Sequence, residues 1–296
     1  MKIAAIDIGS NACRMLICEV LESEKRGPQF IKLNLVRVPL RLGFDVFENG
    51  LISESKIEDF ISTFKSYRHL MNVYDIKHYD ACATSAMRDA KNSSDIIKRI
   101  KETTGIDIRI ISGKEEADTI FQNHFEKYLD SNKPYLYIDV GGGSTELTLF
   151  NKNEVLFEES FNVGAIRLLK KKVEDAEWNR LKEFVKTKTK GINSIIGIGS
   201  GGNINKVFSM SKRKDGKPLP VSVLNEYYEE FKSLSIPERM AKYNLREDRA
   251  DVIFPAIMIY TSVMRWANMS EIYVPQLGLV DGLLQNVYNR IKNTPV

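Results

Sequence analysis

The sequence predicts an α/β protein built from two similar domains. One observation is a repeat: a short apolar run rich in β-forming residues, an aspartate, a turn of small residues and a second apolar run occur at 3–17 and again at 135–149. Asp7 and Asp139 occupy equivalent positions 132 residues apart, which is far longer than a solenoid repeat. The other observation is that strand and helix patterns alternate along the chain, as in layered α/β proteins. We therefore expect two domains that face one cleft.

The first domain is expected to span residues 1–131. Apolar residues at helical spacing, among them Ile57, Phe60 and Phe64, indicate a long helix that starts at Ser53. After the opening hairpin, the patterns predict strands at 29–35, 78–84 and 106–111, helices at 92–103 and 113–129, and a loop at 42–49. Chain-breaking residues at 130–134 mark the linker to the second domain.

The second domain, residues 132–296, is expected to repeat this plan. The patterns predict strands at 135–140, 145–150 and 154–162, a buried strand that enters the glycine loop at 195–204, and helices at 204–210, 174–190, 222–234, 248–267 and 279–291. The helix at 248–267 is apolar almost all round. Charged residues bracket it, so we interpret it as a buried helix rather than a membrane span.

Composition excludes several classes of protein. A chain of 296 residues with 43% hydrophobic and 28% charged residues is typical of a globular protein. The net charge of +4 is too small to indicate nucleic acid, and the apolar run at 3–6 is too short for a signal peptide, so we expect a cytoplasmic protein without a membrane span. The cysteines, Cys13, Cys18 and Cys82, form no metal-binding pair and are expected to be buried thiols.

Three glycine-containing loops are candidate phosphate sites. Backbone amides can bind phosphate in the turn at 9–12, in the turn formed by Gly141, Gly142, Gly143 and Ser144, and at Gly201, where a helix is expected to begin. The alternative is that each glycine only permits a turn. Three such loops in strand context, two of them with a matched aspartate, favour a cleft that binds phosphate and metal.

Two glutamates follow the predicted strand that ends at Ile111. Ser112 and Glu115 have the spacing of a capping box, which gives Glu115 a structural role. Glu116 points to another face of the helix and is the candidate general base that takes a proton from water. The alternative for Glu116 is a surface glutamate that interacts with the helix dipole.

Carboxylates near the turns are the candidate metal ligands. Asp7, Asp139 and Glu146 supply hard oxygen atoms beside the expected phosphate, as Mg²⁺ prefers. The alternative is that the aspartates only accept hydrogen bonds within their turns. Arg88 and Arg14 can present a planar fork to a phosphoryl group, although Arg88 could instead pair with Asp89.

The chain has no serine-hydrolase elbow and no Walker-type phosphate loop, which leaves water as the simplest nucleophile. At this point its motifs resemble those of the exopolyphosphatase and guanosine pentaphosphate phosphohydrolase (Ppx/GppA) family, in its short two-domain form. The motifs, in order, are DIGSN (7–11), ATSAMR (83–88), SGKEEA (112–117), DVGGGSTEL (139–147), GAIRL (164–168) and RADVI (249–253).

This resemblance implies two actin-like domains of the ASKHA, ribonuclease H-like class around an interdomain cleft. It implies that Glu116 is the catalytic base, that Asp139 and Glu146 organise metal or water, and that Ser10, Asn11, Arg88 and the turn at 141–144 contact phosphate. The expected reaction is Mg²⁺-assisted release of terminal phosphate from polyphosphate by a homodimer. Guanosine pentaphosphate as substrate, an ATP-using kinase of the same superfamily, and a nucleotide-sensing protein without turnover are the alternatives.

Two departures from longer members of the family bear on the substrate. Val280 stands where many relatives are expected to have arginine, and the sequence ends soon after its last helix. From the second departure we expect short polyphosphates to be preferred and chains to be released between cleavages.

Overall fold

The computed structural model describes residues 1–23, 27–121, 133–151 and 154–293. These residues form two units, one comprising Met1–Asn123 with Gly278–Val296 and the other comprising His124–Leu277. The predicted domains, 1–131 and 132–296, differ from these units chiefly in the last helix. That helix, α13 (Leu279–Asn293), packs against the sheet and α5 of the first unit, so the first unit is discontinuous in sequence.

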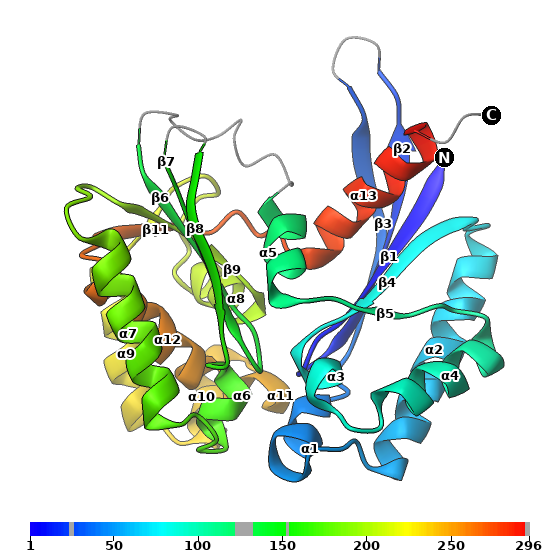
Figure 1. Cartoon of the computed structure of the whole chain (residues 1–296), viewed down its shortest axis with the longest axis horizontal. Helices are drawn as coiled ribbons and strands as arrows, with labels where there is room; N and C mark the ends of the chain where they lie inside the picture. Colours follow the sequence, from blue (N-terminus) through cyan, green and yellow to red (C-terminus); the bar gives the residue numbers. More distant parts are fainter. Residues whose placement is uncertain (24–26, 122–132, 152–153, 294–296) are drawn as a thin grey trace. The chain divides into compact units, whose positions relative to one another are not determined.

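The first unit is a five-stranded mixed sheet with helices on both faces. Its elements are β1 (Lys2–Ile8), β2 (Cys13–Leu21), β3 (Gln29–Val38), α1 (Leu42–Asn49), α2 (Glu54–Val73), β4 (His78–Ala83), α3 (Ser85–Asp89), α4 (Ser93–Thr104), β5 (Arg109–Ile110), α5 (Gly113–Phe121) and α13. The strand order is β3-β2-β1-β4-β5, antiparallel from β3 to β1 and parallel from β1 to β5. Helix α13 lies along one face of this sheet, and α2 and α4 lie on the other (Figure 1).

The second unit has a sheet with the same strand order as the sheet of the first unit and one additional strand, β10 (Leu219–Pro220), at its edge. Its elements are β6 (Tyr135–Val140), β7 (Thr145–Asn151), β8 (Glu154–Phe161), α6 (Ala165–Leu169), α7 (Asp175–Thr189), β9 (Ile196–Ser200), α8 (Gly202–Met210), β10 (Leu219–Pro220), α9 (Val221–Ser233), α10 (Ile236–Tyr243), α11 (Glu247–Ala250), α12 (Ile253–Trp266) and β11 (Glu271–Tyr273). The strand order is β10-β11-β9-β6-β7-β8, so β8-β7-β6-β9-β11 corresponds to β3-β2-β1-β4-β5. This shared plan of three antiparallel strands followed by parallel crossovers confirms two α/β domains of the ribonuclease H-like, actin-like class.

Several predicted elements differ from the structure. The segment expected to be a loop at 42–49 is helix α1. The helix expected over 248–267 is broken into α11 and α12, and the strand expected over 106–111 is only two residues long. Short elements that the patterns did not predict are α6, α10, β10 and β11. The end of the helix predicted over 113–129 and most of the linker at 130–134 fall outside the described residues.

The core of each unit consists of the strands and the helix faces that cover them. In the first unit β1 is buried almost throughout, and Phe60, Phe64 and Tyr67 of α2 pack beneath the sheet. In the second unit α12 packs against β6 and against helices α6 to α9, which explains why it is apolar on nearly every side. The three cysteines are buried free thiols, as predicted. None of the described helices is long and apolar enough to cross a membrane.

Candidate phosphate and metal site

The hairpin turn between β1 and β2 carries Ser10 and Asn11. The Gly9 amide donates to the Ala12 carbonyl at 3.1 Å and closes the turn. The segment that begins α1 then donates to the turn, from the Arg41 amide to the Asn11 carbonyl (3.0 Å) and from the Gly43 amide to the Ser10 carbonyl (2.8 Å). These bonds fix the turn against α1. The helix at 42–49 therefore supports a candidate phosphate loop.

The turn between β6 and β7 is built in the same way. The Gly141 amide donates to the Ser144 carbonyl at 2.9 Å, and the first amides of α6 donate to the turn, from Ala165 to Gly141 (3.0 Å) and from Ile166 to Gly142 (2.8 Å). Arg167 adds a bond from Nε to the Gly143 carbonyl at 2.7 Å. The carbonyl groups of Gly141, Gly142 and Gly143 thus accept hydrogen bonds from α6, and these bonds fix the turn.

The two repeats differ at the position opposite the aspartate. In the first unit, Asp7 of β1 pairs in register with Arg14 of β2, and Arg14 Nη1 lies 3.5 Å from Asp7 Oδ2. Burial raises the pKa of the Asp7 carboxyl, and the Arg14 guanidinium opposes that rise. Asp7, predicted as a metal ligand, therefore has a cationic side chain as its cross-strand partner.

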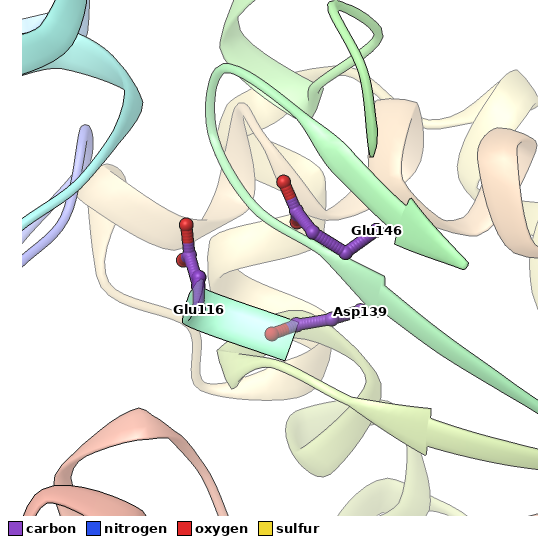
Figure 2. Close-up of side chains that lie close together, drawn as sticks. All are labelled: Glu116, Asp139 and Glu146. Carbon is purple, nitrogen blue, oxygen red and sulfur yellow. The ribbon is translucent and has the colours of Figure 1, made fainter. Parts of the chain in front are cut away.

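In the second unit, the equivalent position holds a second acid. Asp139 of β6 pairs in register with Glu146 of β7, and Figure 2 shows both side chains on their adjacent strands. The side chains are 8% and 1% exposed, and a carboxylate oxygen of one lies within 4.8 Å of a carboxylate oxygen of the other. Ser160 Oγ also lies 3.0 Å from Glu146 Oε1. Two buried carboxylates this close repel each other unless a proton or a cation lies between them.

Gly201 borders this pair of acids. It lies at the N-terminus of α8 with φ of 112°, and a Cβ there would lie 3.1 Å from Asp139 Oδ1 and 3.0 Å from the Val140 carbonyl oxygen. The buried Tyr260 donates to the Ser200 carbonyl on the same loop. Burial raises the pKa of the Tyr260 hydroxyl well above its ordinary value, and the nearby Asp139 charge raises it further. The Tyr260 hydroxyl beside the acids therefore stays neutral, and the absence of a Cβ at Gly201 lets the backbone approach Asp139 closely.

Arg88 and Glu116 contact each other within the first unit. Arg88 lies on α3, and its Nη1 is 3.4 Å from Glu116 Oε2 and donates to the Ile111 carbonyl at 2.7 Å. Both side chains are largely buried, with 22% and 13% of their surface exposed. Glu116, also labelled in Figure 2, is the fourth residue of α5. The carboxylate that the sequence predicts as general base and a guanidinium are thereby held in contact on neighbouring elements of one unit.

The capping-box prediction for Glu115 is only half correct. The Glu115 amide donates to Ser112 Oγ at 3.1 Å, as in a capping box. In the part of the chain that the structure describes, however, the Glu115 carboxylate pairs with Arg109 instead of reaching back to the Ser112 amide. The reason is that a guanidinium ion attracts a carboxylate more strongly than a neutral amide does.

Three supporting residues were not identified from the sequence. Ser85 at the start of α3 shares a buried 2.8 Å hydrogen bond with the Ser10 hydroxyl, which commits that hydroxyl to a structural contact. Gly164 packs directly on the turn at 141–144, and Arg109 is bound to Glu115. Ser85 and Gly164 belong to the motifs at 83–88 and 164–168, but nothing in those motifs indicates their contacts. Arg109 is a single arginine in a predicted strand, a pattern that indicates no particular role.

Comparison with known proteins agrees with this architecture. Residues 22–290 match the model of the Ppx/GppA phosphatase family. The chain is 31% identical, over 97% of its length, to 47% of a bifunctional 3-dehydroquinate synthase/phosphatase of Fusobacterium nucleatum. It is 28% identical, over 59% of its length, to half of exopolyphosphatase 1 of Mycobacterium tuberculosis. The chain thus spans about half the length of these two curated relatives.

A solved structure gives the same fold. The crystal structure of an exopolyphosphatase from Cytophaga hutchinsonii superposes with a TM-score of 0.83 at 24% identity, covering all of this chain and 99% of the other. At this identity the likeness establishes the fold alone, while the match to the family model extends over most of the sequence. The chain therefore belongs to the Ppx/GppA phosphatase family.

Proposed function

We propose that this protein is a hydrolase that releases the terminal phosphate of inorganic polyphosphate by attack of water. Family membership supports a phosphatase, and several relatives of similar sequence are named exopolyphosphatases. Both turns that the proposal assigns to phosphate are fixed by neighbouring helices. The reaction converts a polyphosphate chain and one water molecule into a chain one residue shorter and one phosphate ion.

One observation carries the proposal. The cross-strand position that holds Arg14 opposite Asp7 in the first unit holds Glu146 opposite Asp139 in the second. A buried acid pair suits a divalent cation with oxygen ligands, and Mg²⁺ commonly uses one or two carboxylates together with substrate phosphates. We therefore assign Mg²⁺ to Asp139 and Glu146, where it would neutralise charge on the phosphoryl group. For Asp7 we favour an ion pair with Arg14.

The remaining predicted residues receive roles that their surroundings support. Glu116 is the general base, with its carboxylate beside Arg88. Arg14, Arg88 and Asn11 supply side-chain contacts to phosphate, and Ser10 contributes through the backbone of its turn because its hydroxyl is bonded to Ser85. Gly142, Gly143, Ser144 and Gly201 supply backbone amides. Gly141 supports the same turn, since its own amide donates to the Ser144 carbonyl.

The experiment is a phosphate-release screen over short polyphosphate, long polyphosphate, guanosine pentaphosphate and ATP, with Mg²⁺ present or replaced by chelator. We expect release from polyphosphate that requires metal. Glu116→Gln should lower kcat by about 10²–10⁴-fold. Asp118→Asn is the matched control, because Asp118 is an exposed acid on the same helix, and it should retain activity.

Each other result of the screen assigns a different function. Release from guanosine pentaphosphate alone would replace the polyphosphate assignment, and phosphate transfer from ATP to an acceptor without free phosphate would identify a kinase. Binding of these anions without turnover would indicate a sensing protein. The same screen measures the dependence on chain length.

A further inference from the structure

The catalytic base of the proposed reaction lies just after a weak point in the sheet. Strand β5 has only two residues, Arg109 and Ile110, which pair with Cys82 and Ala83 of β4. The chain then turns at Ser112 into α5, whose fourth residue is Glu116. So short a strand gives the backbone few bonds with which to fix the start of α5. We propose that Arg109 is a positioning residue that holds this turn and thereby the Glu116 carboxylate, an inference that rests on the proposed function.

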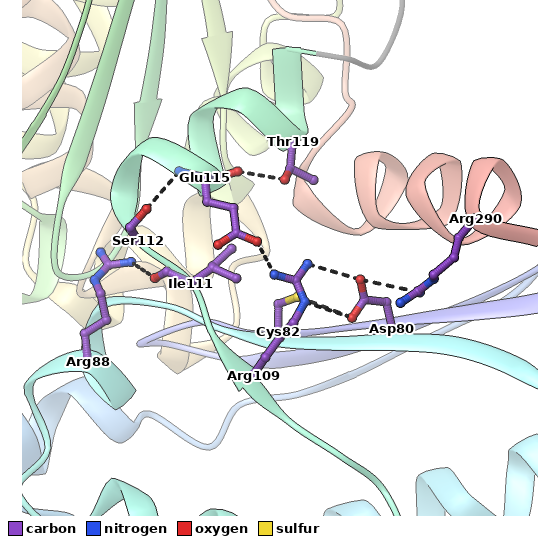
Figure 3. Close-up of polar contacts among 9 residues, drawn as sticks. All are labelled: Asp80, Cys82, Arg88, Arg109, Ile111, Ser112, Glu115, Thr119 and Arg290. Atoms are coloured by element: carbon purple, nitrogen blue, oxygen red, sulfur yellow. Dashed lines mark hydrogen bonds and ion pairs between the residues drawn. The ribbon is translucent and has the colours of Figure 1, made fainter. Parts of the chain in front are cut away.

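Arg109 is anchored in the sheet through Asp80. Its Nε and Nη2 atoms donate to Asp80 Oδ1 and Oδ2 at 3.2 and 3.1 Å, a bidentate pair (Figure 3). Asp80 belongs to β4 and is 8% exposed, and it also contacts the Cys82 thiol and Arg290 of α13. The planar fork of arginine fits a carboxylate in this geometry and fixes the orientation of the guanidinium.

The third nitrogen of the guanidinium reaches across to α5. Arg109 Nη1 pairs with Glu115 Oε1, so one side chain joins the buried strand β4 to the first turn of α5. Partial burial works against the charge of Arg109, but the hydrogen bonds that it donates to Asp80 and Glu115 raise its pKa, so the guanidinium stays charged. Glu115 is the residue before Glu116. A constraint on Glu115 is therefore a constraint on the backbone that carries the base.

Two further contacts complete the support of α5. Arg88 donates to the Ile111 carbonyl at 2.7 Å on the other side of the turn. Gly282 of α13 packs so closely on Thr119 that a Cβ at Gly282 would lie 2.0 Å from the Thr119 carbonyl oxygen. Arg109 thus supplies one of several contacts that hold the helix. Its loss should change the position of the first turn rather than unfold the unit.

The two contacts of Arg109 differ in what they contribute. The Arg109–Glu115 pair is exposed at both ends, at 41% and 46%, so Glu115→Gln should hardly change the melting temperature. Arg109→Gln also removes the bidentate partner of the buried Asp80 and should lower the melting temperature, so its kcat is compared with wild type at temperatures where both are folded. Proton transfer is sensitive to geometry, since a displacement of about 1 Å can cost about 10²-fold in rate. Arg109 does not need to touch substrate for this effect. We therefore expect Arg109→Gln to lower kcat about 10-fold with KM within about 2-fold of wild type.

The test uses the full chain with Arg109→Gln, Glu115→Gln and the double variant. Arg99→Gln is the matched control: it breaks another bidentate arginine–glutamate pair, with Glu54 at 2.6 and 3.1 Å, in the same unit but on α4 and α2. The measurements are kcat and KM for polyphosphate, thermal melting, and hydrogen exchange at the amides of residues 113–119. We expect lower kcat and faster exchange in the Arg109 and Glu115 variants, no further loss in the double variant, and wild-type values for Arg99→Gln.

Two results would overturn the inference: kcat of Arg109→Gln within twofold of wild type, or loss of kcat that follows a loss of folded protein and occurs equally in Arg99→Gln. Failure of the proposed function has a different signature, because wild-type protein would then release no phosphate. In that case the exchange measurement still decides whether Arg109 holds the start of α5. Unchanged exchange in Arg109→Gln would reject that role.

Discussion

Gly164→Ala is a small change that should displace the turn assigned to phosphate. Gly164 precedes α6 with φ of −136°, a conformation that any residue adopts, so backbone strain is not the issue. Space is the issue. A Cβ at this position would lie 2.4 Å from the Gly142 carbonyl oxygen and 2.5 Å from the carbonyl carbons of Gly142 and Gly143. Those backbone atoms cannot rotate away as a side chain can, so the turn or the helix has to move.

The cost follows from the bonds that such a movement strains. Four hydrogen bonds join the start of α6 to the turn: the amides of Ala165, Ile166 and Arg167 donate at 3.0, 2.8 and 3.3 Å, and Arg167 Nε donates at 2.7 Å. Overpacking costs about 1–3 kcal/mol, and each weakened hydrogen bond adds about 1 kcal/mol. We expect a loss of about 2–4 kcal/mol in the free energy of unfolding, which lowers the melting temperature by about 4–16 °C.

Thermal melting and phosphate release measure the two consequences. We expect Gly164→Ala to lose at least about 10-fold in kcat at temperatures where it is still folded, because the turn amides no longer hold their positions. Gly278→Ala is the control, since a Cβ there would meet nothing within 4 Å. Wild-type melting and wild-type kcat in Gly164→Ala would show that the close packing of this turn is not required.

Three other changes test separate features. Arg14→Gln should cost about 1–3 kcal/mol at pH 7, since it removes the ion pair of the buried Asp7. Because burial raises the folded pKa of Asp7 above its unfolded value, the protein loses stability as the pH rises and Asp7 ionises, and this loss is larger without Arg14. The stability difference between wild type and Arg14→Gln should therefore shrink toward about pH 4–5, where Asp7 is protonated. Urea titrations that give the same difference at pH 7 and at this lower pH would contradict the prediction. Burial raises the pKa of the Cys18 thiol to about 11, so thiol reagents at pH 8 should react only after unfolding, and rapid labelling of native protein would be the contrary result. Glu146→Gln should weaken Mn²⁺ binding measured by electron paramagnetic resonance, whereas Glu183→Gln, on the exposed side of α7, should not; equal affinities would remove the metal assignment.

The strands and long helices could be predicted because their patterns are local. Short runs of β-forming residues on either side of a turn of small residues mark β6 and β7, and helical spacing of apolar residues marks α2. Helix α1 was missed since it has only eight residues and its first turn is fixed by a bond from Gly43 to Ser10, a contact distant in sequence. The break between α11 and α12 has a local signal in Pro255, which lies in the first turn of α12, where a missing amide is tolerated.

The candidate site was predictable as residue types but not as pairs. The repeat aligns Asp7 with Asp139, yet the two sites differ in charge at the next aligned pair, Arg14 and Glu146. Strand register makes each of these the cross-strand partner of the aspartate in its own unit. Glu115 was assigned to a capping box because the motif is local, while its actual partner is bound in turn to an aspartate 29 residues before it in the chain. Contacts of that kind depend on the sheet and on packing between elements. Sequence spacing does not contain them.

We propose that water attacks the terminal phosphorus of polyphosphate with Glu116 as base, and isotopic oxygen reports on that step. The most direct measurement is hydrolysis in water enriched in oxygen-18, followed by mass spectrometry of the products. We expect one oxygen-18 atom in each released phosphate, none in the shortened chain, and loss of this product in Glu116→Gln. Label in the shortened chain, or wild-type phosphate release by Glu116→Gln, would contradict it.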